Sequence, residues 1–318
     1  MVYLYAFAYH EDERDLFEME RRALFGAGDG VPAGMAAFRS EREIDPRRSP
    51  FLKSRLDVRF EGDSPVELAE RIREAGVAAP SFKVVYGKTG ESELSYEDRR
   101  AVERIVGAAV RGTADMRTPA EKFGVAAYGG RWAFGPLRES GDAWQKHARK
   151  PRQYSTALGA RLARAVANIA VPEPSGIRAI DPCCGIGTVL LEALSMGVDI
   201  VGSDVNPLAV LGARENVSHY GYPDVVRVAD ARDVAGAYDV AIVDLPYNLC
   251  SVLPERELDE LLAAVRRMAI RAVLIATTPI DDAVSRAGFA VRDRCEARKG
   301  SFRREVVAVE RDATVTKF

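Results

Sequence analysis

Residues 177–188 read IRAIDPCCGIGT, a short apolar run that ends in Asp181 and is followed at once by a glycine-rich turn. The run is typical of a buried strand. The glycines of Gly185-Ile186-Gly187 let the backbone turn tightly and approach a ligand closely. The residues from Thr188 onward indicate a helix, whose first N–H groups would face the turn. Strand, turn and helix in this order predict an α/β fold with a ligand-binding loop at a strand end.

Further short apolar runs come after this stretch, with helical stretches between them. They lie at 199–204, 224–230, 238–244 and 271–277. Alternating strands and helices predict a Rossmann-like parallel sheet built from βαβ units. Two last strand-like runs flank Lys299-Gly300 and predict a closing antiparallel hairpin.

The glycine turn alone is a weak signal, because an ordinary tight turn has the same residues. A dinucleotide-binding fingerprint needs a third glycine or an alanine at position 190, where this chain has Leu190. The sequence therefore disfavours a nicotinamide cofactor and makes a dehydrogenase the least favoured class of enzyme.

Two carboxylates follow the next strands of the predicted sheet. Asp204 ends the second strand, at the separation from the glycine turn at which a carboxylate meets ribose hydroxyls. Asn206-Pro207 is also a good helix start, so Asp204 could simply support that cap. Asp230, followed by Ala231, ends the third strand and could accept a hydrogen bond from an adenine amine, or could be a solvated loop acid.

The sharpest motif is Asp244-Leu245-Pro246-Tyr247-Asn248, directly after the strand-like YDVAIV. The Asp244 carboxylate and the Pro246 carbonyl can each accept one N–H of an exocyclic amine and so orient its nitrogen. Tyr247 can stack on the base that carries the amine. In isolation the motif also suits an ordinary turn of Asp, Pro and Asn. Together with the upstream motifs, in this order, it favours catalysis at a nucleobase amine.

The N-terminal half reads as an α+β unit with the element order βαββαβ, a ferredoxin-like pattern. Ser64-Pro65 and Ser95 begin two predicted helices, and a hairpin is expected across Gly129-Gly130. The polar, basic segment 139–153 is predicted to link this half to the C-terminal domain at 154–318.

Composition and charge exclude several classes of protein. The chain has 318 residues, a net charge of −2 and 47% hydrophobic residues, so it is neither a bulk polycation nor disordered. Its four cysteines form no CxxC pair and its three histidines cluster with no other ligand, so no metal site is expected. The start resembles no signal peptide and no apolar run could span a bilayer, so we expect a reducing cytoplasm.

Residues 150–311 resemble a class I S-adenosylmethionine-dependent methyltransferase that acts on amines, and in particular the THUMP-containing tRNA guanine-N2 methyltransferases. The resemblance rests on the DPxCGxGT-like turn, on the later (D/N)PPY-like motif, and on KPRQYSTAL at 150–158. It implies a seven-stranded Rossmann-like sheet, preceded by a ferredoxin-like domain at 1–92 and a THUMP-like module at 93–138. The chain differs from the family at Leu245, where proline is usual, and at Asn248, which is often glycine.

The resemblance also implies roles for individual residues. The base would be received by Asp244, Pro246, Tyr247 and Asn248. S-adenosylmethionine would be bound by Tyr154, Ser155, Thr156, Asp181, Gly185, Gly187, Asp204, Asn206, Asp230 and Ala231. The RNA substrate would be tRNA, and the sequence leaves open the oligomeric state and a need for a small activating protein partner.

Two alternatives stay open beside an RNA guanine-N2 methyltransferase. A DNA methyltransferase acting on adenine N6 would use the same pocket chemistry, although the N-terminal half resembles an RNA-binding appendage. A non-catalytic RNA-binding protein with a vestigial methyltransferase fold is the other, and the intact acidic positions disfavour it. Basic groups near 47–55, 146–152 and 298–304 could contact phosphates, or could be solvated surface.

Overall fold

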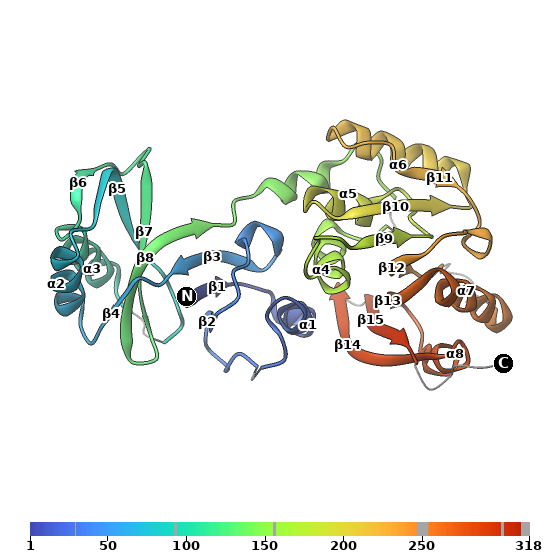
Figure 1. Ribbon diagram of the computed structural model, residues 1–318, viewed down its shortest axis with the longest axis horizontal. Coiled ribbons are helices and arrows are strands. Elements are labelled where there is room, and N and C mark those ends of the chain that lie inside the picture. The colour runs from blue at the N-terminus through green and yellow to red at the C-terminus, as the bar shows by residue number, and fades with distance from the viewer. Residues whose placement is uncertain (29, 92–93, 155–156, 247–253, 300–301, 313–318) are drawn as a thin grey trace. The chain divides into compact units, whose positions relative to one another are not determined.

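The computed structural model describes residues 1–28, 30–91, 94–154, 157–246, 254–299 and 302–312. It divides into two compact units, drawn in Figure 1. The N-terminal unit comprises Met1–Ala8 and Gly28–Gly141, and the C-terminal unit comprises Tyr9–Ala27 and Asp142–Phe318.

The C-terminal unit is built on a seven-stranded sheet with the order β11-β10-β9-β12-β13-β15-β14. The first five strands in this order, β11, β10, β9, β12 and β13, are parallel. Strand β15 of the β14–β15 hairpin pairs antiparallel with β13. The predicted Rossmann-like sheet with its closing hairpin is therefore confirmed. The strands are β9 (Arg178–Asp181), β10 (Asp199–Asp204), β11 (Val226–Val228), β12 (Tyr238–Asp244), β13 (Ala269–Ala276), β14 (Phe289–Lys299) and β15 (Phe302–Arg311).

Helices cover both faces of this sheet. One face packs on α7 and α8 through a core that contains Val243, Leu274 and Val307. On the other face lies α4, whose alanines and Val166 are buried. The helices of this unit are α1 (Arg14–Phe25), α4 (Ala160–Ala170), α5 (Thr188–Ser195), α6 (Pro207–His219), α7 (Glu255–Met268) and α8 (Asp281–Arg286).

Helix α1 packs in the C-terminal unit, although its sequence lies inside the domain predicted at 1–92. It contacts α4 and β14. Asn168 donates from Nδ2 to Oε1 of the buried Glu20 at 2.7 Å, and Arg22 makes two hydrogen bonds to Asp293 at 2.8 and 2.9 Å. These partners are 148 and 271 residues away, so local sequence gave no sign of them. The segment 1–92 is thus not one compact piece.

The N-terminal unit contains an eight-stranded sheet, ordered β2-β1-β3-β8-β7-β5-β6 with β4 paired to β8. The predicted helix starts are confirmed, because the Ser64 and Ser95 hydroxyls accept hydrogen bonds from Glu67 and Asp98 at 3.1 Å. Its elements are β1 (Tyr3–Phe7), β2 (Ala37–Ser40), β3 (Leu52–Asp57), β4 (Phe60–Gly62), α2 (Pro65–Glu74), β5 (Ala78–Tyr86), α3 (Tyr96–Gly107), β6 (Arg111–Ala114), β7 (Glu121–Tyr128) and β8 (Arg131–Glu139).

One hydrophobic core of this unit crosses the boundary predicted at 92/93. Leu68 and Ile72 of α2 and Phe82 of β5 pack in the same cluster as Val106 of α3 and Phe134 of β8. The structure therefore places no division there. The ferredoxin-like and THUMP-like assignments of these parts stay proposals.

Much of the segment predicted as a linker at 139–153 is folded onto the C-terminal unit. It forms the short 3₁₀ helix η3 (Ala143–Arg149), which contacts α4 and α5. His147 Nδ1 lies 2.8 Å from Oε1 of the fully buried Glu192, whose Oε2 accepts a hydrogen bond from Arg164 at 2.7 Å. Burial lowers the pKa of nearby Lys150, while Glu192 opposes this effect. The contact between the His147 ring and the Glu192 carboxylate therefore fastens this polar segment to α5.

Candidate active site

The glycine turn between β9 and α5 adopts a backbone that other residues resist. Gly185 and Gly187 have φ values of +52° and +76°. A Cβ on Gly187 would lie 3.1 Å from the Ala213 Cβ of α6, so this glycine allows the turn to pack closely on that helix. A Cβ on Gly185 would meet nothing within 4 Å. The turn is therefore packed on one side and open on the other.

Asp204 ties the glycine turn to the end of β10. Its Oδ2 accepts the Gly185 N–H at 2.8 Å and its Oδ1 accepts the Asn206 N–H at 2.9 Å. The Asn206 side chain in turn caps α6 by accepting the Leu208 N–H at 3.0 Å. The predicted cap is confirmed, and Asp204 also organises the turn. Its proposed contact with a ribose stays a prediction.

Asp230 has a partner that the sequence did not reveal. Its carboxylate accepts the Arg232 backbone N–H at 2.8 Å and pairs with the Arg232 guanidinium at 2.6 Å. These hydrogen bonds lower the pKa of Asp230, the side-chain bond most strongly. Asp230 is thus a fixed carboxylate that begins the one-turn helix η4 (Ala231–Asp233), rather than a loosely solvated loop acid.

Asp244 at the end of β12 carries an unsatisfied buried oxygen. Its Oδ1 is inaccessible to solvent and has no hydrogen-bond partner among the described residues. Burial raises the pKa of Asp244 to about 6, and the Arg304 guanidinium opposes this rise. A buried polar atom without a partner is costly and points to a donor supplied by a ligand.

Asp181 lies beneath the turn and is almost fully buried. Its Oδ1 accepts the Cys183 N–H at 3.2 Å. Burial raises the pKa of Asp181 well above its usual range, and the nearby carboxylates Asp244 and Asp204 add to the rise. A cationic ligand near these three carboxylates would relieve their mutual repulsion.

A cavity of about 530 Å³ at the carboxyl edge of the sheet brings the predicted residues together. Such a volume suits a small-molecule site of about 300–1,000 Å³, and the strand order reverses between β9 and β12 at this edge, where α/β sheets bind ligands. Six predicted site residues line it: Asp204, Asn206, Asp230, Ala231, Asp244 and Pro246.

The other predicted site residues lie elsewhere or outside the described residues. The lining of the cavity does not include Asp181, which ends β9, or Gly185 and Gly187 of the glycine turn. Tyr154 is 53% exposed and does not line it either. Ser155, Thr156, Tyr247 and Asn248 lie outside the part of the chain that the structure describes.

Further cavity residues were missed by the sequence analysis. Cys183 and Arg232 adjoin predicted residues and could have been found from that position alone. Glu257 and Leu261 come from α7, where nothing in the sequence marks them. Together the lining holds four carboxylates and one arginine among its charged groups, a balance that favours a ligand with positive charge.

Many residues of the predicted basic groups are engaged in ion pairs or buried. Arg47 pairs with Asp45 at 2.6 Å and the buried Arg55 pairs with Asp57 at 2.6 Å. Arg152 pairs with Glu215, and Arg304 is 8% exposed and lies over the Phe302 ring at 4.6 Å. These arginines therefore serve the fold as well as the surface charge.

Comparison with known proteins agrees with this geometry in the C-terminal unit. Residues 147–274 match the family described as RMKL-like, methyltransferase domain. A tRNA (guanine(10)-N2)-dimethyltransferase of Methanothermobacter thermautotrophicus is 39% identical over 105 residues, which cover 32% of this chain and 31% of that one. A protein of the same name from Pyrococcus abyssi is 34% identical over 116 residues, which cover 35% and 34% of the two chains.

A third relative is the U6 snRNA (guanine-N(2))-methyltransferase THUMPD2 of Mus musculus, 33% identical over 106 residues that cover 30% of this chain and 20% of that one. The chain thus matches about a third or less of the length of these curated relatives. The crystal structure of TrmN from Thermus thermophilus aligns with 98% of this chain and 100% of its own at 22% identity and a TM-score of 0.48, which carries no weight for function. The matched segment resembles the RNA guanine-N2 methyltransferases, as the motifs indicated.

Proposed function

We propose that the protein transfers a methyl group from S-adenosylmethionine to the exocyclic N2 amine of a guanosine in RNA, with tRNA as the substrate. The observation that carries this proposal is the unsatisfied, buried Oδ1 of Asp244, at the cavity that Asp204 and Asp230 also line. That oxygen is placed to accept an N–H from an amine. The names of the matched relatives support guanine and RNA as the base and the substrate class.

The lining of the cavity fits S-adenosylmethionine, which supplies an electrophilic methyl group on a positively charged sulfur when bound. Asp204 would bind the ribose hydroxyls and Asp230 with Ala231 would face the adenine. Asp181, Gly185 and Gly187 would support the methionine portion through the turn. The acidic lining suits the positive charge of this ligand.

Asp244 and Pro246 would orient the acceptor amine. Each N–H that donates to the carboxylate or to the Pro246 carbonyl leaves the nitrogen lone pair directed away from these acceptors. The amine exchanges one N–H bond for an N–CH3 bond and must release one proton. Oδ1 of Asp244, with a pKa of about 6, is a suitable first acceptor for it near neutral pH. The base must leave its stack to reach this point, which costs a few kcal/mol.

We also propose roles for the remaining residues predicted from the sequence. Tyr247 would stack on the base, and Asn248 would help to receive it. Tyr154, Ser155 and Thr156 would close the cofactor side. We also propose a reducing compartment, the cytoplasm, because the described cysteines Cys183, Cys184 and Cys295 are free thiols. Within the described residues, no helix is long and apolar enough to cross a membrane.

The test separates cofactor binding from transfer. Calorimetry with S-adenosylmethionine should show binding to the wild-type protein and to Asp244→Ala, because Asp204 and the turn are intact in both. Methyl transfer to tRNA should be lost only in Asp244→Ala. Full activity of that variant would refute the assignment, and methylation of duplex DNA instead of tRNA would favour adenine N6 chemistry.

A further inference from the structure

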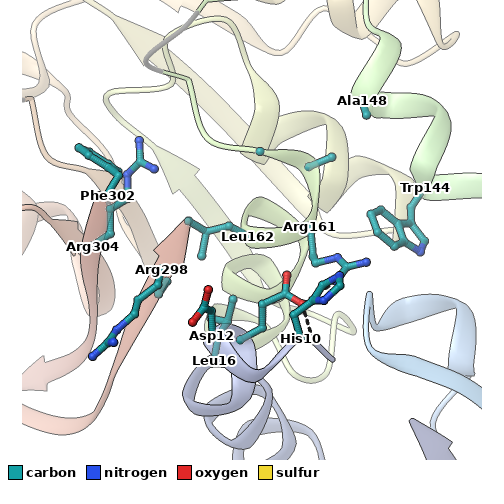
Figure 2. A pocket seen from close by; sticks show the side chains of 14 residues that line it. His10, Asp12, Leu16, Trp144, Ala148, Arg161, Leu162, Arg298, Phe302 and Arg304 are labelled. Atoms are coloured by element: carbon teal, nitrogen blue, oxygen red, sulfur yellow. Dashed lines mark hydrogen bonds and ion pairs between the residues drawn. The ribbon is translucent and has the colours of Figure 1, made fainter. Parts of the chain in front are cut away.

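A second cavity of the C-terminal unit has no role in the proposed function so far. It has a volume of about 400 Å³ and is bounded by the start of α4, by α1, by η3 and by the β14–β15 hairpin. Figure 2 shows Phe302 and Arg304 of β15 on one side and Trp144 with Arg161 on the other. Its lining thus combines aromatic rings with guanidinium groups.

The register of the sheet places this cavity on the same face as Asp244. Asp244 pairs with Ile275, which pairs with Val306. Cross-strand partners point to one face, and Arg304 precedes Val306 by two residues, so it shares that face. Two strand spacings of about 4.8 Å separate Asp244 from the β15 column. Arg304 lies two residues further along β15, so the cavity begins about 12 Å from Asp244 along the sheet, within reach of a nucleotide next to the one at Asp244.

The composition of the lining suits an unstacked nucleotide. The half-buried Phe302 ring carries the Arg304 guanidinium 4.6 Å from its centre, and the Arg161 guanidinium lies 5.9 Å from the centre of the Trp144 ring. Arginine-backed aromatic rings are surfaces on which bases stack. Leu162 adds an apolar wall.

Charge favours a phosphate at the rim. The cavity has three arginines against two carboxylates, and Glu13, one of these carboxylates, is neutralised by Arg161 at 2.6 Å. Arg298 is 45% exposed at its side chain and pairs with Glu296 on its own strand. An exposed arginine in such a pair can exchange its surface carboxylate for a phosphate at small cost.

We propose that this cavity is a subsite for the nucleotide that flanks the methylated one in the RNA, with its base against Phe302, beside the largely buried Trp144, and its phosphate at Arg298. The proposal rests on the proposed function, since it assumes that the RNA reaches Asp244. It adds a reason why the enzyme would select an unpaired segment, because two neighbouring bases would have to leave their stacks.

The test uses Trp144 as a reporter. The chain has two tryptophans, and Trp132 lies in the N-terminal unit. In Trp132→Phe, Trp144 is therefore the only tryptophan whose emission is measured. In this background, with saturating S-adenosylhomocysteine, the single-stranded RNA UUUGUUU should quench Trp144. Replacing one neighbour of the guanosine, either the 5′ or the 3′ uridine, with an abasic nucleotide should weaken binding about fivefold or more. The same replacement of the other neighbour should have a smaller effect.

Phe302→Ala should weaken binding of the intact RNA by a similar factor, and should leave no further effect of the missing base, because both changes remove the same contact. Arg298→Ala should make the negative slope of log affinity against log salt concentration shallower by about 0.7. The matched control Arg292→Ala on the same strand should leave this slope unchanged. Unchanged S-adenosylhomocysteine affinity in each variant would show that the fold is intact.

The proposal is overturned if the loss of affinity from Phe302→Ala and the loss from the missing base multiply when they are combined. It is also overturned if neither neighbouring base affects the affinity when it is removed, or if the RNA fails to quench Trp144. These outcomes differ from failure of the proposed function. A wild-type protein that binds no S-adenosylmethionine would refute the proposed reaction, whereas one that binds it and ignores the neighbouring base would refute the subsite alone.

Discussion

Asp244→Asn should stabilise the C-terminal unit at pH 8 while abolishing methyl transfer. In the folded protein, burial holds the pKa of Asp244 near 6, against the ordinary 3.8. At about 1.36 kcal/mol for each pH unit, this difference corresponds to about 3 kcal/mol of lost stability once the folded carboxyl is ionised. The gain from asparagine at pH 8 should therefore be about 3 kcal/mol, since the pKa of about 6 already includes the favourable effect of Arg304.

The direction with pH follows from the raised pKa. Below about pH 3.8 the carboxyl is protonated in both the folded and the unfolded chain, and it costs nothing. As pH rises, the unfolded chain ionises first, so the wild type loses stability until the folded carboxyl ionises near pH 6. The stability difference between the variant and the wild type should therefore grow by about 2 kcal/mol between pH 4.5 and 8.

Urea unfolding followed by Trp144 emission, in the Trp132→Phe background, measures this difference in the C-terminal unit alone. Asp199→Asn is a matched control, since Asp199 is exposed at the start of β10, at the opposite edge of the sheet. An Asp244→Asn protein no more stable than the wild type at pH 8, or a difference that does not change with pH, would refute the reasoning.

Three further predictions follow from the same geometry. Arg304→Gln should move the acid limb of the pH–activity profile to higher pH, because Arg304 lowers the pKa of Asp244; an unmoved limb would contradict this. Gly187→Ala should cost about 1–2 kcal/mol in urea unfolding and weaken cofactor binding in calorimetry, since its φ is +76° and its Cβ would press on Ala213 at 3.1 Å. Glu192→Gln should cost about 3–5 kcal/mol in the same unfolding assay by leaving Arg164 buried without its counter-charge, and a cost below about 1 kcal/mol would speak against a buried ion pair.

The features read correctly from sequence were those with a local physical cause. Alternating apolar runs predicted the strands of the C-terminal sheet, and Asn206 and Ser64 predicted helix starts because side-chain oxygens cap nearby N–H groups. Asp204 and Asp244 could be placed at one edge because parallel strands end together. The order of the strands, and the place of the closing hairpin in it, were not predicted, since periodicity does not specify which strands pair.

The features missed had distant partners. The place of α1 depends on Asn168 and Asp293, far along the chain. The segment at 139–153 was predicted as a linker because it is polar, yet His147 contacts the buried Glu192 and Lys150 lies near it. Composition cannot distinguish such a buried charge cluster from a solvated one.

Nucleoside mass spectrometry of tRNA incubated with the protein and methyl-labelled S-adenosylmethionine tests the central claim most directly. We predict labelled N2-methylguanosine with the wild-type protein and none with Asp244→Asn, which should still bind the cofactor. Label in N6-methyladenosine, label in no nucleoside despite measured cofactor binding, or equal labelling by both proteins would contradict it.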